Sequence, residues 1–222
     1  MKANLVSTLL RNALTGLSVL LLSACALHAT KTAAPTTYSL DFGTPSAPAV
    51  PAPSPATAPT LLVAPMLAAS GYDSTHIIYT RLAHQPEYFA HSLWIDTPVR
   101  MIAPLMVTAL ANSGTFLAVA PTTSAVAGDL RLNTELVRLE HDFSTQPAQM
   151  QFTLRATLVD NGTRRVLAWR EFNETVPTPG DAPYDGIKAA NSAVQAGLQE
   201  LSVFCAEAVH QWQTSKISAG DH

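Results

Sequence analysis

"QMQFTLRATLVDNGTRRVLAWREFNETV", residues 149–176, carries the strongest local pattern in the chain. Apolar and polar residues alternate on both sides of Asp160-Asn161-Gly162, and a period of two is typical of β-strands with one buried face. Asn and Gly adopt positive φ angles easily, so the three central residues suit a tight turn. The stretch therefore predicts a β-hairpin whose two strands are joined at this turn.

The segments on either side of the hairpin extend this pattern. The preceding stretch DLRLNTELVRLEHDF (129–143) places Leu130, Leu132 and Leu136 on one side of a strand, with charged residues on the other. After the hairpin, apolar residues recur every three or four positions from about Pro183 to Gln213, which predicts a long amphipathic helix. Its expected buried stripe consists of Ile187, Ala190, Val194, Leu198, Leu201, Cys205, Ala208 and Trp212.

A second helix is predicted in DTPVRMIAPLMVTALANSG (96–114). Thr97 suits the N-cap, Pro98 suits the first helical position, and the cluster Asn112-Ser113-Gly114 suits the end. Pro104 lies inside the helix and is expected to kink it, because proline removes one hydrogen bond and clashes with the preceding turn.

Further strands are predicted upstream of the hairpin. TLLVAPMLA (60–68) and THIIYTRL (75–82) are apolar enough for buried strands, and FLAVAP (116–121) suits a short one. YSLDFG (38–43) alternates enough to form a strand near the start of the domain. The chain thus alternates strands with two helices.

The first residues have the composition of an export signal. Lys2 and Arg11 are the only charges before the apolar run 13–22, which is the arrangement of a secretory signal peptide. This run has about half of the ~20 residues that a membrane-spanning helix needs. Leu22-Ser23-Ala24-Cys25 resembles the lipobox of bacterial lipoproteins, which implies a signal peptide 1–24 and acylation of Cys25. Acyl chains on Cys25 would anchor the protein in a membrane, because each buried CH₂ contributes ~0.8 kcal/mol. The alternative is an ordinary cleaved signal followed by an incidental cysteine.

The remaining chain is predicted to hold one domain. Residues 25–37 then form a polar tether, and 38–214 a single domain. The Pro/Ala-rich run 43–59 has no periodicity and favours an extended conformation, so it is either a surface loop or a stalk. We expect the tail 215–222 to be disordered.

Charge and cysteine content argue against a nucleic-acid-binding protein and against a disulfide-stabilised one. The net charge is −3 and the basic residues are scattered, which argues against a nucleic-acid partner. Only Cys25 and Cys205 are present, so acylation of the first leaves no disulfide to form.

No catalytic motif is present in the sequence. It lacks G-x-S-x-G, H-E-x-x-H and a glycine-rich phosphate loop. The spacing of His76, His84 and His91 fits solvated histidines better than a metal site. Asp181 and Asp185 fit loop and helix-entry positions better than an acid–base pair, and Cys205 fits a small core residue. We expect no cofactor, no metal and no enzymatic activity.

Three aromatic residues, Tyr88, Phe89 and Trp94, lie just before the first predicted helix, in sequence with the character of a loop. Trp94 can pack as a lid on the core. Alternatively, the three form an exposed patch that contacts a partner protein or an acyl chain, because aromatic anchors often carry interface energy.

The order and spacing of these segments are similar to those of the ABC-type transport auxiliary lipoproteins, the family that includes paraquat-inducible protein C. The likeness covers nearly the whole mature chain. It rests on the lipobox cysteine, YSL (38–40), IIYTR (77–81), YFAHSLWIDTP (88–98), DLRLNTELVRLEHDF, VDNGTRRVLAWREF (159–172) and the closing helix. The long Pro/Ala run and Pro104 depart from the family pattern.

The resemblance implies an α/β fold, a two-layer sandwich with a mixed sheet and two main helices, like the N-terminal domain of the TolB translocation protein. It also implies a non-catalytic docking or lipid-handling role beside an MCE-domain protein, a permease and an ATPase. Such systems move phospholipid or other hydrophobic molecules between the two membranes of Gram-negative bacteria. The alternative is a stand-alone lipoprotein that itself binds a lipid or another hydrophobic ligand.

The resemblance also bears on location and assembly. Ala26 stands where the family-wide sorting rule places aspartate for retention in the inner membrane. We therefore expect the periplasmic face of the outer membrane rather than the inner membrane. The resemblance also allows a homo-oligomeric ring.

Overall fold

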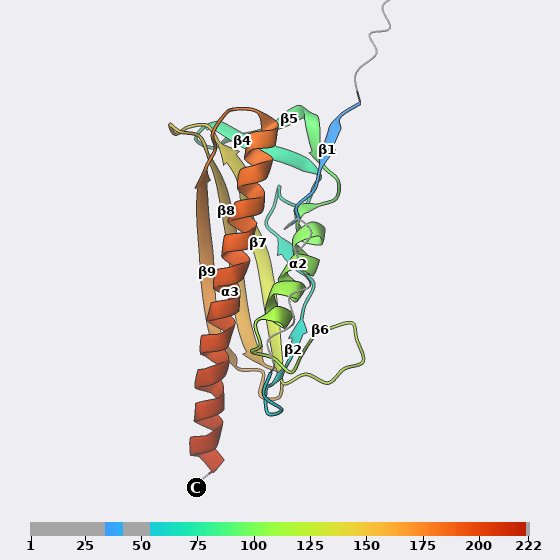
Figure 1. The fold of residues 1–222 in the computed structure, drawn as a ribbon, viewed down its shortest axis with the longest axis vertical. Coiled ribbons are helices and arrows are strands. Elements are labelled where there is room, and N and C mark those ends of the chain that lie inside the picture. Colours follow the sequence, from blue (N-terminus) through green and yellow to red (C-terminus); the bar gives the residue numbers. More distant parts are fainter. Residues whose placement is uncertain (1–33, 42–53, 221–222) are drawn as a thin grey trace, which may run out of the picture. The chain divides into compact units, whose positions relative to one another are not determined.

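A single mixed sheet with both helices on one face forms the domain. The computed structural model describes residues 34–41 and 54–220. Over these residues nine strands form the sheet, and helices α2 (Pro98–Asn112) and α3 (Pro183–Gly220) lie side by side across it (Figure 1). The predicted α/β fold class, with a mixed sheet and two main helices, is confirmed.

Strand β7 (Leu130–Asp142) organises the sheet, because it pairs along its whole length. On one side it pairs antiparallel with β8 (Gln149–Asp160), which pairs antiparallel with β9 (Val166–Pro177). These two strands are the hairpin predicted from alternation.

Three short strands line the other edge of β7 one after another, all parallel to it. They are β2 (Thr60–Val63), β3 (Leu67–Ala68) and β4 (His76–Leu82). The sequence predicts one strand over 60–68, whereas the structure has two, with Pro65 in the gap between them. Proline lacks the N–H that a continuous strand would donate to its neighbour, so the ladder is interrupted there.

The outer strands complete the sheet at both ends of this edge. Strand β5 (Gln85–Trp94) pairs antiparallel with β4, and β1 (Thr36–Tyr38) pairs parallel with β5. Strand β6 (Ala118–Pro121) pairs parallel with β2.

The turn between β8 and β9 differs from the predicted one. Five residues, 161–165, separate the strands, and the positive φ angle of 59° belongs to Arg164 rather than to Asn161 or Gly162. The loop is closed by backbone hydrogen bonds from Asp160 to Arg165 and from Arg164 to Asp160. A five-residue loop spreads the reversal over more bonds, so the two-residue positive-φ turn is not needed.

Alternation in β7 places its leucines against the helices. Leu132 and Leu136 are fully buried, and the register then shifts between Leu136 and Arg138. This bulge resets the alternation, so that Leu139 and His141 also face inward. The opposite face of the sheet, which we call the open face, is covered by neither helix (Figure 1), and along β7 it carries polar residues such as Arg131, Glu135 and Glu140.

Helix α2 begins as predicted at Pro98, with Thr97 at the N-cap position and Ser113 at the C-cap. The side chain of Thr97 makes no capping hydrogen bond, contrary to expectation. The backbone carbonyl of Thr97 instead accepts hydrogen bonds from the N–H groups of Arg100 and Met101.

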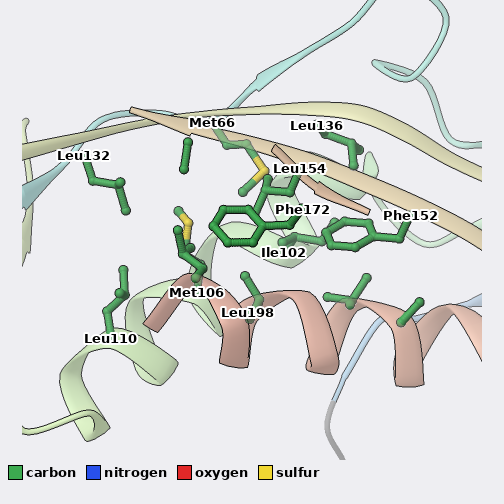
Figure 2. Close-up of a cluster of buried hydrophobic side chains, with 14 of the residues drawn as sticks. Met66, Ile102, Met106, Leu110, Leu132, Leu136, Phe152, Leu154, Phe172 and Leu198 are labelled. Carbon is green, nitrogen blue, oxygen red and sulfur yellow. The ribbon is translucent and has the colours of Figure 1, made fainter. Parts of the chain in front are cut away.

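Helix α3 packs along β8 and β9 and closes the core, which Figure 2 shows between sheet and helices. Gly197 allows close approach, since a Cβ atom there would lie 2.6 Å from Cε1 of Phe152. The helix continues to Gly220, so residues 215–220 are helical rather than disordered. No glycine or proline interrupts this stretch before Gly220, and the Lys216 ammonium lies 4.0 Å from the centre of the Trp212 ring.

The segment before the Pro/Ala run belongs to the domain. Tyr38 pairs with Trp94, Leu40 is buried, and the backbone N–H of Asp41 donates to Oδ1 of Asn191 in α3. The alternative in which everything before Thr60 is a stalk is therefore wrong, and the tether ends before Thr36 rather than at residue 37. Cys25 and most of the run 43–59 lie outside the described residues.

The chain divides into two units, Met1–Ala34 and Pro35–His222. The buried core formed by the described residues lies wholly within the second unit. Because its sheet and both helices enclose that core without the first unit, the second unit is expected to fold on its own.

Candidate functional site

The open face of the sheet contains a cavity of about 430 Å³ near the β4–β5 hairpin. A row of paired residues across three strands forms its floor: Tyr88 in β5 lies opposite Ile78 in β4, which lies opposite Glu140 in β7. Tyr72, from the loop between β3 and β4, forms one wall. The cavity thus draws on segments that are far apart in the sequence.

A hydrogen bond holds the wall to the floor. The Tyr72 hydroxyl donates to Oε2 of Glu140 at 2.7 Å, and Nε of Arg138 lies 3.8 Å from Oε1 of the same carboxylate. Burial, helped by the hydrogen bond to Glu140, raises the pKa of Tyr72 well above its ordinary value. Tyr72 therefore remains a protonated donor at any physiological pH.

A second group of polar contacts continues along the cavity. Arg138 donates to Oε1 of Gln151, and Nε2 of Gln151 donates to Oδ2 of Asp142 at 2.7 Å. The other carboxylate oxygen of Asp142 accepts hydrogen bonds from the backbone N–H and the hydroxyl of Ser144. Both acids in the cavity are thus held by neighbouring donors, an arrangement that suits recognition better than general base catalysis.

The structure separates the three predicted aromatic site residues, because they lie on a strand rather than in a loop. Tyr88 is 51% exposed, lines the cavity and stacks against His76 with ring centroids 4.9 Å apart. Phe89 points to the opposite face, 4.5 Å between ring centroids from Tyr79. Alternation along β5 sends successive side chains to opposite faces.

Trp94 is only 2% exposed and belongs to the hydrophobic core. Of the two interpretations of this residue, the structure supports the core lid. The proposed partner or lipid contact is wrong for Trp94, because a buried indole offers no surface to a partner.

The other sequence candidates do not assemble into a reactive site. Asp185 lies 2.9 Å from Nζ of Lys188, in an ion pair within the first turns of α3. Cys205 is fully buried, and burial raises the pKa of its thiol to about 12. Over residues 34–41 and 54–220, no three His, Cys, Asp or Glu side chains are grouped to hold a metal ion.

Sequence reasoning missed Tyr72, Arg138 and Glu140. Arg138 and Glu140 lie at alternate positions of β7, and this pattern predicted that both side chains face solvent. It did not predict that they line a cavity. Their partner Tyr72 lies in a loop about seventy residues earlier, and the hydrogen bond between Tyr72 and Glu140 spans 68 positions. No local pattern reports such a contact.

None of the helices in the described part of the chain is long and apolar enough to cross a membrane.

The chain folds like several solved structures. Protein XCC0632 from Xanthomonas campestris, described under family model DUF330, is 23% identical; the match covers 81% of this chain and 99% of that one, with a TM-score of 0.69.

Two further structures share the fold at lower identity. One uncharacterized protein is 11% identical, with 78% of this chain and 99% of that chain covered and a TM-score of 0.60. The hypothetical protein CT253 from Chlamydia trachomatis is 8% identical, with 68% and 98% covered and a TM-score of 0.50. At these identities the likeness shows the fold alone.

Comparison with curated protein sequences gave no match. The family model for the ABC-type transport auxiliary lipoprotein component, in contrast, matches residues 38–202. This span runs from the end of β1 into the second half of α3 and includes every strand that lines the cavity. The protein belongs to the ABC-type transport auxiliary lipoprotein family.

Proposed function

We propose that the protein is the non-catalytic docking component of an MCE-type ABC transport system that moves phospholipid or other hydrophobic molecules between the inner and outer membranes. The family match over residues 38–202 carries this proposal. The cavity on the open face supports it, because its acids are held by neighbouring donors and its rim presents an exposed tyrosine.

Acyl chains on Cys25 hold the domain at the periplasmic face of the outer membrane. Ten residues, 26–35, separate this cysteine from the start of β1. A fully extended chain spans at most ~3.3–3.6 Å per residue, so the first residue of β1 can lie no more than about 40 Å from Cys25.

Replacing Cys25 by alanine tests the anchor. We expect the Cys25→Ala variant to move from the membrane fraction to the soluble periplasmic fraction. Cys205→Ala is the matched control, because that thiol is buried and its loss should leave the protein in the membrane. Recovery of exported, unaggregated Cys25→Ala protein in the membrane pellet would refute the anchor. Sucrose-gradient separation of the two membranes then tests the outer-membrane location.

Affinity purification in mild detergent tests the docking role. An MCE-domain protein should co-purify with the wild type, and Tyr88→Ala should weaken that binding by ~2 kcal/mol if Tyr88 is an interface anchor. Asn173→Ala, on the open face of β9 away from the cavity, is the control. If no such partner co-purifies and the purified domain instead carries phospholipid, the alternative of a stand-alone lipid-binding protein is favoured.

A further inference from the structure

The basic side chains of the domain fall into two groups. Six of the ten described by the structure make ion pairs with Asp or Glu: Arg81, Arg100, Arg138, Arg155, Arg170 and Lys188. The other four make no ion pair with any described residue, and all four are exposed: Arg131, Arg164, Arg165 and Lys216.

These four residues, which we call the basic end, lie together at one end of the sheet. Arg164 and Arg165 are in the β8–β9 loop, and Arg131 pairs with Val159, which pairs with Val166 directly after that loop. Lys216 and Arg165 line one hollow of about 500 Å³. In Figure 1 this is the lower end of the sheet, where α3 finishes.

The nearby acids are already engaged in hydrogen bonds. Oδ1 of Asp160 accepts the backbone N–H of Thr163, and Oδ2 accepts the indole N–H of Trp212. Oδ2 of Asp129 accepts the backbone N–H of Thr60. Four cations against these two acids leave the basic end net positive, although the whole chain is negative.

Exposed apolar side chains border the same surface. Val166 is 60% exposed and Trp169 is 67% exposed, both on β9. Trp169 in β9 pairs with Thr157 in β8, and Thr157 pairs with Asn133 in β7. Arg131 is two positions from Asn133 and therefore points to the same face of β7. The Trp169 indole and the Arg131 guanidinium thus lie on the same open face of the sheet. Cations beside an exposed indole are the combination that membrane-surface proteins present to lipid head groups.

We infer that the basic end binds a bilayer surface rich in anionic phospholipid, with its cations on the phosphate-bearing head groups and Trp169 in the interface. It lies at the opposite end of the sheet from β1, the first strand of the domain (Figure 1). This contact is additional to the proposed acyl anchor and does not depend on it.

Vesicle binding tests the inference on the unit Pro35–His222, which lacks Cys25. Flotation would compare phosphatidylcholine vesicles with vesicles of equal parts phosphatidylcholine and phosphatidylglycerol. We expect binding to the anionic vesicles only, and release at high salt, since the screening length falls from ~10 Å at 0.1 M to ~3 Å at 1 M.

Two double variants locate the contact. Arg164→Gln with Arg165→Gln should weaken vesicle binding about twenty- to thirtyfold, because each cation near an anionic surface contributes about fivefold, equivalent to ~1 kcal/mol. Arg131 lies in β7 and Lys216 in α3, outside the β8–β9 loop. The double variant Arg131→Gln with Lys216→Gln should weaken vesicle binding by a similar factor. Arg81→Gln with Lys188→Gln removes the same charge at the other end and is the matched control.

Tryptophan fluorescence reports on the interface. The blue shift expected on adding anionic vesicles should be lost in Trp169→Phe, while Trp94 and Trp212 remain. Equal loss of binding in the control pair, equal binding to both vesicle types, or binding of soluble inorganic phosphate without binding to vesicles would each overturn the inference. An unchanged blue shift in Trp169→Phe would overturn the placement of this indole in the bilayer interface.

Discussion

The indole Nε1 of Trp212 donates a 2.7 Å hydrogen bond to Oδ2 of Asp160, which ties the last turns of α3 to the β8–β9 turn. The other carboxylate oxygen of Asp160 accepts the backbone N–H of Thr163. The hydrogen bond from Thr163, followed by that from Trp212, lowers the pKa of Asp160. The folded state therefore favours the ionised carboxylate.

Loss of this hydrogen bond should destabilise the domain in a pH-dependent way. Trp212→Phe keeps an aromatic ring but removes the donor, and we expect a loss of ~1–3 kcal/mol at neutral pH. Because the folded pKa lies below the ordinary value of about 3.9, the stability is present above that pH and is lost as the pH falls through the folded pKa. Urea denaturation across this range measures it. Trp169→Phe, with an exposed indole, should match the wild type.

Gly197→Ala should destabilise the domain, although alanine normally favours a helix by ~1 kcal/mol over glycine. The new Cβ would lie 2.6 Å from Cε1 and 3.1 Å from Cδ1 of Phe152, whose ring is fully buried. Forcing a core apart typically costs ~1–3 kcal/mol. Chemical denaturation of the variant should show a net loss.

A double variant separates this clash from any other effect of the alanine. In a Phe152→Leu background the nearest ring atoms are gone, so Gly197→Ala should cost less there than in the wild type. An equal cost in both backgrounds would show that the contact with Phe152 is not the cause.

His141 is fully buried, and its orientation fixes its tautomer. The Thr178 hydroxyl donates to the backbone carbonyl of Ala148, so it accepts from Nε2 of His141 at 3.0 Å. Nδ1 then carries a lone pair and has no hydrogen-bond partner among the described residues. It faces Gly186 in the first turns of α3, where an added Cβ would lie 2.7 Å away.

The stability of the domain should fall as the pH drops below the ordinary pKa of histidine, about 6.5. Burial lowers the pKa of His141, although the carboxylates of Asp181, Asp142 and Asp185 act in the opposite direction. A folded pKa below the unfolded value of about 6.5 means that the stability is complete above that pH and is lost as pH falls toward the folded pKa. The free energy of unfolding, measured from about pH 8 to about pH 5 on either side of the ordinary histidine pKa, should decrease as the pH falls.

His141→Gln should flatten the slope, because glutamine stays uncharged in this range. His91→Gln changes an exposed histidine and serves as the control. A slope that survives in His141→Gln would assign the pH dependence to other groups.

Alternation gave the right secondary structure for the β8–β9 hairpin because each strand buries one face against α3, and that pattern is local. Contacts between distant segments left no such signal. The bulge after Leu136 depends on how β8 pairs with β7. The row Tyr88–Ile78–Glu140 needs the register of three strands, which alternation along one strand does not contain.

Trp94 and Tyr88, on the same strand, should respond in opposite ways to truncation. Trp94→Ala removes a buried indole from the core and should cost ~3–5 kcal/mol of stability, while protein that remains folded keeps its partner contacts. Tyr88→Ala removes a half-exposed ring at the cavity rim, so it should cost little stability and weaken partner binding instead. Both variants would be compared by urea denaturation and by pull-down at matched folded concentrations. If Tyr88→Ala were as destabilising as Trp94→Ala, its ring would be structural, and the cavity rim would lose its claim as the docking surface.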